Sequence, residues 1–456
     1  MAKTKYKSAW FCSDCGAESP KWAGRCPECG AWNTMVEERV AASPVRSASP
    51  VAGHGKSVAR PLNAISTVEM PRIKLPSGEL NRVLGGGLVP GEMVLIGGEP
   101  GVGKSTLVLQ NLLSIRSKTI LYASGEESAM QLKMRADRLG RGSDNMYIVC
   151  ETSLERIFDH IDAVNPGIVV IDSIQTIASD VLDSSAGSVS QVRECAARLL
   201  AYAKETDVPV LLIGHITKDG SLAGPKVLEH IVDAVLQFEG DRQYMFRILR
   251  AIKNRFGNTA ELGIYEMGQK GLREVTNPSE LLLHTTDTDL SGVAVGVTVD
   301  GARPFLIEVQ ALVSTAAYGT PQRSVTGFDS KRTNMLLAVL EKRVGFKLAA
   351  KDVFLNIAGG IKVNDPALDL PVICAILSSN FDVALPHDTC MTGEVGLSGE
   401  IRPVARIEQR IAEAEKLGMR RIIVPAGNIK GIDTARFNIE VIESARVPDA
   451  VKILFA

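Results

Sequence analysis

One short glycine-rich stretch constrains this chain more than any other feature. It follows the apolar run Met93–Ile96 and consists of Gly98, Glu99, Pro100, Gly101, Val102, Gly103, Lys104, Ser105 and Thr106. Glycines let a backbone curl until several N–H groups point at one polyphosphate. Lys104 is then placed to reach the β- and γ-phosphates, and the Ser105 hydroxyl to ligate magnesium at the start of the next helix. An accidental glycine-rich turn would lack the flanking strand and helix, so we predict a Walker A loop that binds ATP and Mg²⁺.

Two further apolar runs end on carboxylates. The run Gly167–Ile171 closes on Asp172, a Walker B arrangement in which the carboxylate holds the magnesium shell. The run Thr119–Ala123 is followed by Glu126 and Glu127, which at the carboxyl end of a strand are placed to polarise an attacking water. Glutamates are also common as helix caps. We favour a catalytic role, with Glu126 ahead of Glu127.

A fourth apolar run, Val208–Ile213, leads to His215. This histidine either senses the γ-phosphate or is simply a hydrogen-bonded structural residue. Apolar strands that alternate with helices predict an α/β fold, a mainly parallel sheet with helices on both faces. The ligand is then expected at the carboxyl edge of the sheet.

Four cysteines form two C-x-x-C pairs that are separated by ten residues, namely Cys12, Cys15, Cys26 and Cys29. Four thiolates leave no open position for water, so the spacing predicts a structural Zn²⁺ site. A redox dithiol or disulfide pair is the alternative, but a reducing compartment and a segment too short for its own core favour the metal. The four other cysteines are expected to be buried free thiols, namely Cys150, Cys195, Cys374 and Cys390.

The four-cysteine segment also contains basic and aromatic residues. Lys21, Arg25, Trp22 and Trp32 have side chains that can contact nucleic acid or protein. In a module this small, we expect the tryptophans to form its core instead.

Composition indicates the compartment in which the protein works but does not indicate its function. The chain has 456 residues, 45% of them hydrophobic, and a formal net charge of −1, so no global field attracts nucleic acid. A DNA contact would therefore need a local basic patch or an oligomeric ring. We find no apolar run near the ~18 residues of a membrane span. The segment Met1–Lys7 lacks the apolar core of a signal peptide. A cytoplasmic protein with no membrane partner is expected.

Several stretches together resemble one bacterial family. They are the Gly85–Gly87 lead-in, the Walker A loop, Ser124–Ser128, Ile171–Thr176 and Lys253–Gly257, behind the four-cysteine finger. This combination is similar to the RadA (Sms) DNA-repair family over essentially the whole chain. The resemblance implies a RecA-like ATPase core, DnaB-like hexameric rings and branch migration during homologous recombination. It also implies single-stranded or branched DNA as a partner.

The C-terminal part has a different pattern of apolar residues. Val293–Val299 and Phe305–Val309 alternate apolar and other residues around an Asp300–Gly301 turn, which predicts a hairpin opening a separate α/β domain. The stretch Gly393–Pro403 and the helix after it resemble the proteolytic domain of Lon. Lon needs a serine nucleophile and a lysine, but Ala367 and Glu408 stand at or near those positions. We therefore expect a non-proteolytic scaffold.

These interpretations divide the chain into four parts. We predict a zinc finger at 1–36, a flexible linker rich in Ala, Ser and Pro at 37–61, a RecA-like ATPase domain at 62–276 and a Lon-like domain at 277–456. A flexibly tethered finger suits recruitment of a partner protein, such as a recombinase or replication protein.

Two sets of basic residues are candidates for further roles. Polar loops at Ser179–Val192 and Thr217–Lys226, the latter with Lys218 and Lys226, are expected to face DNA, although solvated surface loops fit the composition equally well. Lys253 and Arg255 either end a strand in solvent or reach the γ-phosphate of a neighbouring subunit. We favour the second role, helped by the resemblance.

Three functions compete for this chain. The leading hypothesis is a ring-shaped, DNA-stimulated ATPase that acts as a motor. An ATP-dependent protease is opposed by the missing serine and lysine. A nucleotide-switched binding module, resembling the clock ATPases of the RecA superfamily, is the third. Stimulation of ATP hydrolysis by single-stranded DNA would separate the motor from the other two.

Overall fold

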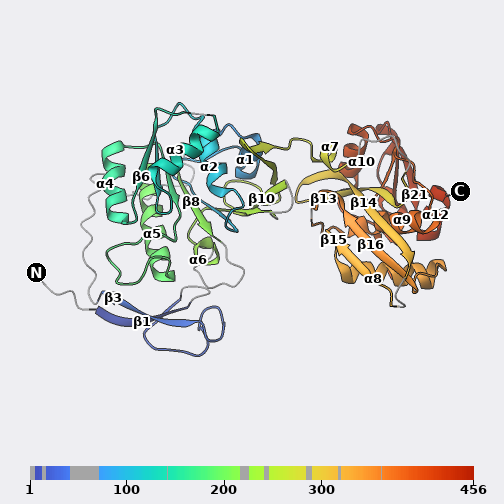
Figure 1. Cartoon of the computed structure of the whole chain (residues 1–456), viewed down its shortest axis with the longest axis horizontal. Helices are drawn as coiled ribbons and strands as arrows, with labels where there is room; N and C mark the ends of the chain where they lie inside the picture. The colour runs from blue at the N-terminus through green and yellow to red at the C-terminus, as the bar shows by residue number, and fades with distance from the viewer. Residues whose placement is uncertain are drawn as a thin grey trace, which may run out of the picture. The chain divides into compact units, whose positions relative to one another are not determined.

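The computed structural model divides the chain into two compact units, Met1–Val275 and Thr276–Ala456 (Figure 1). It describes residues 6–12, 17–41, 71–140, 142–215, 225–240, 246–283, 290–316, 320–360 and 362–455. Within these ranges, no helix is long and apolar enough to cross a membrane.

A nine-stranded sheet forms the centre of the first unit, in the order β12-β11-β10-β9-β4-β8-β7-β5-β6. The strands are β4 (Met93–Gly98), β5 (Ile120–Ser124), β6 (Met146–Cys150), β7 (Ile168–Asp172), β8 (Val210–His215), β9 (Ala234–Glu239), β10 (Phe246–Asn254), β11 (Leu262–Gly268) and β12 (Gly271–Glu274). The six from β9 to β6 run parallel, and β10, β11 and β12 continue the sheet antiparallel. The predicted mainly parallel sheet is confirmed.

Helices cover both faces of this sheet. They are α1 (Gly78–Leu84), α2 (Lys104–Leu112), α3 (Ala129–Arg138), α4 (Leu154–Val164), α5 (Val189–Thr206) and α6 (Pro225–Glu229). Alternate residues of a strand point to opposite faces, and β4 shows this directly. Its Val94 and Ile96 join the core with α1, α2 and α3, whereas Met93 and Leu95 join the core with α4, α5 and α6. Both faces are apolar, which explains the continuous apolar runs in the sequence.

The N-terminal segment forms a three-stranded antiparallel ribbon, in the order β2-β1-β3. Its strands are β1 (Tyr6–Cys12), β2 (Glu18–Ser19) and β3 (Met35–Ala41). The linker was predicted to begin at residue 37, but residues 37–41 are paired with β1. Backbone pairing with a distant strand therefore overrides the local composition at this boundary. The rest of the predicted linker lies outside the described residues.

The second unit is built on a seven-stranded mixed sheet, in the order β15-β16-β14-β13-β17-β20-β21, beside a two-stranded one. The strands are β13 (Val293–Asp300), β14 (Arg303–Thr315), β15 (Arg323–Thr326), β16 (Lys351–Ile357), β17 (Thr389–Met391), β18 (Glu394–Val395), β19 (Ile401–Arg402), β20 (Arg421–Pro425) and β21 (Glu440–Ser444). The helices are α7 (Pro278–Leu282), α8 (Ser330–Val339), α9 (Asp369–Phe381), α10 (Ile407–Lys416), α11 (Ala426–Ile429) and α12 (Val447–Phe455). The predicted hairpin is confirmed, because β13 pairs with β14 and Asp300 lies opposite Arg303.

Three of the four isolated cysteines, Cys195, Cys374 and Cys390, are buried as predicted. The prediction was wrong for Cys150, which is exposed and donates to the Glu127 carbonyl at 3.3 Å. Cys150 ends β6, which has a strand on one side only and is covered less completely than the central strands.

Candidate functional site

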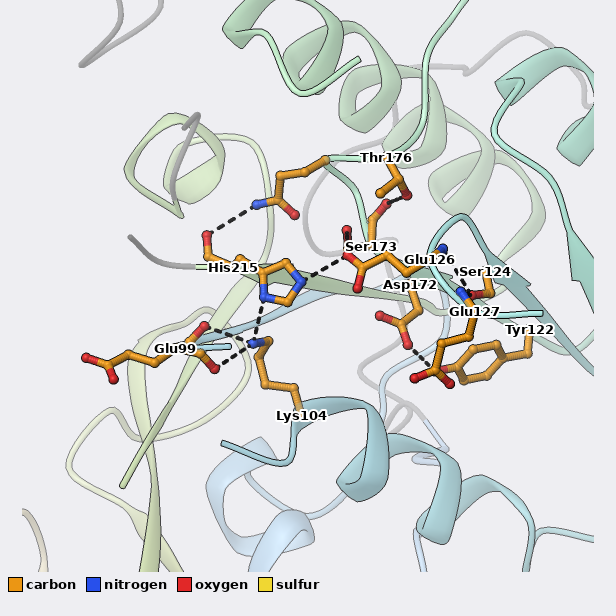
Figure 2. Close-up of polar contacts among 12 residues, drawn as sticks. Glu99, Lys104, Tyr122, Ser124, Glu126, Glu127, Asp172, Ser173, Thr176 and His215 are labelled. Carbon is orange, nitrogen blue, oxygen red and sulfur yellow. Dashed lines mark hydrogen bonds and ion pairs between the residues drawn. The ribbon is translucent and has the colours of Figure 1, made fainter. Parts of the chain in front are cut away.

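The predicted nucleotide residues meet at the carboxyl edge of the parallel sheet. In the strand register, Gly98 at the end of β4 lies opposite His215 at the end of β8. Asp172 at the end of β7 lies opposite Ser124 of β5, after which the chain turns to Glu126. Figure 2 shows Lys104, His215, Glu126 and Asp172 gathered at this edge.

Lys104 is the first residue of α2 and its side chain is buried. Its Nζ donates to the Gly98 carbonyl at 2.8 Å, to the Glu99 carbonyl at 3.0 Å and to His215 Nδ1 at 3.1 Å. Burial lowers the pKa of Lys104 to about 8, while the charges of Asp172 and Glu126 oppose that fall. The ammonium form therefore still predominates at pH 7.

His215 connects Lys104 to Glu126 (Figure 2). An ammonium group has donors only, so Nδ1 of His215 must accept, which leaves Nε2–H to donate. Nε2 lies 3.0 Å from Glu126 Oε1, and the Ser173 hydroxyl donates to the same oxygen at 2.5 Å. The His215 hydrogen bond is the main cause that lowers the pKa of Glu126 to about 2. Glu126 is therefore an ionised carboxylate held in one orientation beside Lys104.

The two adjacent glutamates have different surroundings. Glu127 forms an ion pair with Arg135 of α3. Neither glutamate caps that helix, because Ser128 is its N-cap and forms a capping box with Gln131. The geometry thus favours Glu126 over Glu127 for contact with a nucleotide, in the order expected from the sequence.

Asp172 and Ser105 offer oxygen ligands side by side. Ser105 hydrogen-bonds to the buried Asp172 carboxylate, and the Tyr122 hydroxyl donates to Asp172 Oδ2 at 2.5 Å. Burial raises the pKa of Asp172, so a nearby cation would stabilise its ionised form. Carboxylate and hydroxyl oxygens next to a phosphate loop suit Mg²⁺. The residues therefore fit the predicted ion.

Tyr122 was not singled out from the sequence. Its ring is fully buried in the sheet, and burial raises the pKa of its hydroxyl well above the usual value. A buried tyrosine needs a hydrogen-bond partner for its hydroxyl. Its place inside the apolar run Thr119–Ala123, one residue before the end, was the available signal.

The cysteine cluster fits a zinc ion. The Sγ atoms of Cys12, Cys26 and Cys29 lie within 4.8 Å of one another, and Cys12 Sγ is 3.6 Å from Cys29 Sγ. Tetrahedral zinc with Zn–S bonds of about 2.3 Å places its sulfurs about 3.8 Å apart. Cys15, the fourth predicted ligand, lies outside the described residues.

Replacing Cys26 and Cys29 by serine is expected to release roughly one zinc per chain and to disorder the first ~35 residues, because zinc binding supplies the folding energy of such a segment. DNA-independent ATPase activity should largely survive. Metal analysis checks the first outcome. The exposed Cys150→Ser variant is the matched control and should keep its zinc. Undiminished zinc in the double variant would contradict the assignment.

Trp22 and Trp32 do not form the core of the ribbon, which corrects the prediction. Trp22 is 57% exposed and Trp32 is 71% exposed. The described core is instead small and includes two of the metal-ligand cysteines: Cys12, Cys26 and Met35, with Trp10, Ala17 and Ala23 packed against it. Both rings lie in the connection between β2 and β3, outside the paired strands.

Lys253 and Arg255 lie at the other edge of the sheet. Lys253 is the penultimate residue of β10, and Arg255 follows its last residue, Asn254. Asn254 pairs with Ala234, the first residue of the parallel strand β9. Lys253 Nζ donates to the carbonyls of Glu229 at 2.5 Å and Val232 at 2.8 Å. The structure does not bring these cations to Lys104 of the same chain.

The backbone around these cations is closely fixed. Arg72 donates to the Phe256 carbonyl at 2.7 Å and to the carbonyls of Leu84 and Gly87 at 3.3 Å. A Cβ atom on Gly257 would lie 2.9 Å from Gly85 Cα, so glycine is required for this approach. The Gly85–Gly87 lead-in and the Lys253–Gly257 stretch, separate in sequence, therefore pack together. Phe256, between Arg255 and Gly257, is partly buried.

The predicted DNA loops are placed only in part. Lys218 lies outside the described residues. Lys226 belongs to α6, but its side chain is not described. The segment Ser179–Val192 forms a closed loop, because the Gln191 side chain donates to the carbonyls of Ser179, Leu182 and Ser184, each at 3.1 Å.

The Lon-like segment offers no nucleophile at the predicted position. Ala367 is buried in a short 3-10 turn, Pro366–Leu368. Asp365, next to it, forms a 2.7 Å ion pair with the buried Arg410. Glu408, near the expected lysine position, pairs with Arg436 at 2.9 Å.

Three family models match this chain. A rubredoxin metal binding domain matches residues 10–37, an AAA domain matches residues 59–221, and subunit ChlI of Mg-chelatase matches residues 309–428. The first two confirm the predicted Zn²⁺, ATP and Mg²⁺, and all three agree with the predicted fold class.

The chain is similar throughout its length to proteins named DNA repair protein RadA. The Bacillus subtilis protein is 50% identical, with 99% of each chain covered. The Listeria monocytogenes protein is 50% identical over 94% of each chain. The Streptococcus pyogenes protein is 46% identical, covering 99% of this chain and all of the relative. A KaiC-like protein of Pyrococcus horikoshii, 22% identical, matches 45% of this chain and 99% of its own with a TM-score of 0.39.

Proposed function

Because this chain belongs to the family of the DNA repair protein RadA, and so carries an ATPase domain of a DNA repair protein, we propose that it is a DNA-stimulated ATPase that assembles as a ring. The ring promotes branch migration of recombination intermediates and acts on single-stranded or branched DNA. A hexamer is the expected assembly.

The ring proposal depends on one observation: the residues of the nucleotide site and the cations Lys253 and Arg255 lie at opposite edges of the sheet. Lys104, Glu126 and Asp172 lie at the carboxyl edge of the parallel strands. Lys253 and Arg255 lie on either side of Asn254, which pairs with the first residue of β9 at the amino edge. A cation at the second edge can serve a nucleotide only if that nucleotide is bound to another copy of the chain. Such head-to-tail contacts close into a ring when the rotation allows it.

Within one site, each side chain has a role that its contacts support. Lys104 now donates to two carbonyls and an imidazole, and we expect it to turn to the more strongly accepting phosphate oxygens of ATP. His215 Nδ1 then loses its donor. Glu126, ionised and oriented by Ser173 and His215, is placed to orient the attacking water.

Ser105 and Asp172 would hold Mg²⁺, with Tyr122 fixing the Asp172 carboxylate. The ion, when bound, supplies positive charge to the β- and γ-phosphate oxygens. Lys253 and Arg255 of a neighbouring copy would add charge where it develops during transfer of the phosphoryl group.

The experiment that tests this function is ATP hydrolysis with and without single-stranded DNA. A motor hydrolyses ATP faster when DNA is bound, and the same preparation should extend or resolve a branched recombination intermediate in an ATP-dependent manner. A nucleotide-switched binding module would show hydrolysis that is indifferent to DNA. That outcome would contradict the motor.

The second unit is expected to show no peptidase activity, even with ATP and an unfolded protein substrate. Ala367 has no hydroxyl, and the neighbouring Asp365 is already paired with Arg410. Incubation with unfolded casein, followed by detection of released peptides, checks this. Cleavage that a serine-directed reagent blocks would contradict it.

A further inference from the structure

We propose that the N-terminal ribbon is itself a contact for single-stranded DNA, in which Trp22 and Trp32 stack on bases and Lys21 and Arg25 contact the phosphates. This inference rests on the proposed action on DNA and assigns a part of that contact to the ribbon. It concerns the turn from Lys21 to Asn33, which we call the knuckle.

Both rings present their surface to solvent. Trp32 is 71% exposed and Trp22 is 57% exposed, although burial of a tryptophan would stabilise so small a module considerably. Two large exposed rings within one short turn offer a surface for a contact.

The knuckle holds each ring in a defined place. Arg25 and Trp32 lie opposite each other across an antiparallel bridge, and the Arg25 guanidinium lies 5.8 Å from the centre of the Trp32 ring. Arg25 Nε also donates to the Gly30 carbonyl at 2.9 Å, so the cation is fixed beside the ring. The Trp22 ring passes close to Gly24, where a Cβ atom would lie 3.5 Å from it. The Gly24 carbonyl accepts from Asn33 N–H at 2.8 Å, which ties the two halves of the knuckle together.

The surroundings of the rings favour nucleic acid over a protein partner. Among the described residues of the ribbon, the large exposed apolar side chains are Trp22, Trp32 and Val36, which is few for an apolar protein contact. Aromatic faces combined with cations are the arrangement by which single-stranded DNA is bound without sequence preference. Apart from the cysteines, the charged side chains from residue 21 to residue 33 are Lys21, Arg25 and Glu28, two cations against one carboxylate.

The chain offers a direct optical test. It contains three tryptophans, Trp10, Trp22 and Trp32, and all three lie in the ribbon, so tryptophan fluorescence of the full chain reports on this module alone. Adding an oligo-dT strand to the zinc-loaded full chain should quench the emission, because stacked bases contact the rings. An abasic strand of the same length and charge should quench much less.

Variants separate stacking from folding. In a titration followed by the anisotropy of a labelled oligo-dT, Trp22→Ala with Trp32→Ala should weaken binding at least about tenfold. The matched Trp22→Phe with Trp32→Phe variant should keep most of the binding, since phenylalanine still offers a ring. Both should retain zinc, which shows that the ribbon is folded, and both should retain basal ATP hydrolysis.

Three outcomes would overturn the inference. They are an emission that oligo-dT leaves unchanged at concentrations that stimulate ATP hydrolysis, equal quenching by the abasic strand, and quenching only by an added recombinase or other protein. DNA-stimulated hydrolysis is measured on the same samples. Stimulation without quenching leaves the proposed function intact and removes only the ribbon contact, whereas loss of stimulation itself would reject the proposed function.

Discussion

Replacing Lys104 by alanine is expected to lower ATP turnover at least about a hundredfold while the protein stays folded. The side chain is buried, yet its hydrogen-bond partners are the carbonyls of Gly98 and Glu99 and the ring of His215. Its removal therefore takes a positive charge from the phosphate site and leaves the two apolar cores untouched. Steady-state hydrolysis gives the first quantity, and thermal unfolding should shift by no more than a few degrees.

The matched control is Lys133→Ala. Lys133 is also a helical lysine, but its side chain is 63% exposed and is paired with Asp137 on the surface of α3. This variant should hydrolyse ATP at the rate of the unaltered protein. Retained hydrolysis in Lys104→Ala would reject the assignment of the phosphate loop.

The sequence predicted the carboxyl edge of the sheet well for a physical reason. Buried parallel strands appear as short apolar runs, and the residue after each run must emerge at the same edge. The sequence alone therefore predicts Asp172 and Glu126 beside Lys104. Their hydrogen bonds to Tyr122, Ser173 and His215 could not be predicted, because these depend on the register between neighbouring strands.

Predictions of burial were wrong for residues of the small ribbon and of an edge strand. Trp22 and Trp32 were predicted to form a core because the module is small, but they lie in the connection between β2 and β3 and are exposed. Cys150 was assigned to the interior, but the edge strand β6 leaves it exposed. Composition does not reveal how many layers cover a residue.

The packing of the Gly85–Gly87 lead-in against Gly257 was predicted only in part. Each stretch was recognised in the sequence as part of a family resemblance, but nothing in the sequence predicted that the two stretches are in contact. Gly85 and Gly257 approach closely, and Arg72 bridges the two segments. This is a tertiary contact between segments that are far apart in the sequence. It fixes the backbone from which Lys253 and Arg255 project.

Arg255→Ala is expected to lose most DNA-stimulated hydrolysis while keeping nucleotide binding. Arg255 is 56% exposed, and its ion pair with Asp233 is long, at 3.4 Å. The buried Asp233 carboxylate keeps its 2.7 Å ion pair with Lys204 when Arg255 is removed, so stability should change little. Binding of a fluorescent ATP analogue and hydrolysis with single-stranded DNA measure the two properties separately. Arg255→Lys, which keeps the charge but not the planar group, should retain part of the activity.

Mixing Arg255→Ala with Lys104→Ala tests whether the arginine acts on a neighbour's nucleotide. Each variant lacks one half of the site, and a complete site forms wherever Lys104 of one copy meets Arg255 of the other. With equal amounts and random assembly, about a quarter of the contacts in a head-to-tail ring should be complete. Hydrolysis should therefore reappear in the mixture and should peak near the equal ratio.

The control mixture combines Arg255→Ala with a chain that carries both substitutions, so that no copy supplies Arg255. It should stay inactive at every ratio, which excludes recovery through changes in assembly alone. Exchange of subunits is followed with two fluorescent labels. If labelled subunits exchange freely and the Arg255→Ala and Lys104→Ala mixture shows no recovery, Arg255 does not act between subunits. Because the structure places it at the edge of the sheet away from Lys104, that result would leave Arg255 without direct contact with any nucleotide.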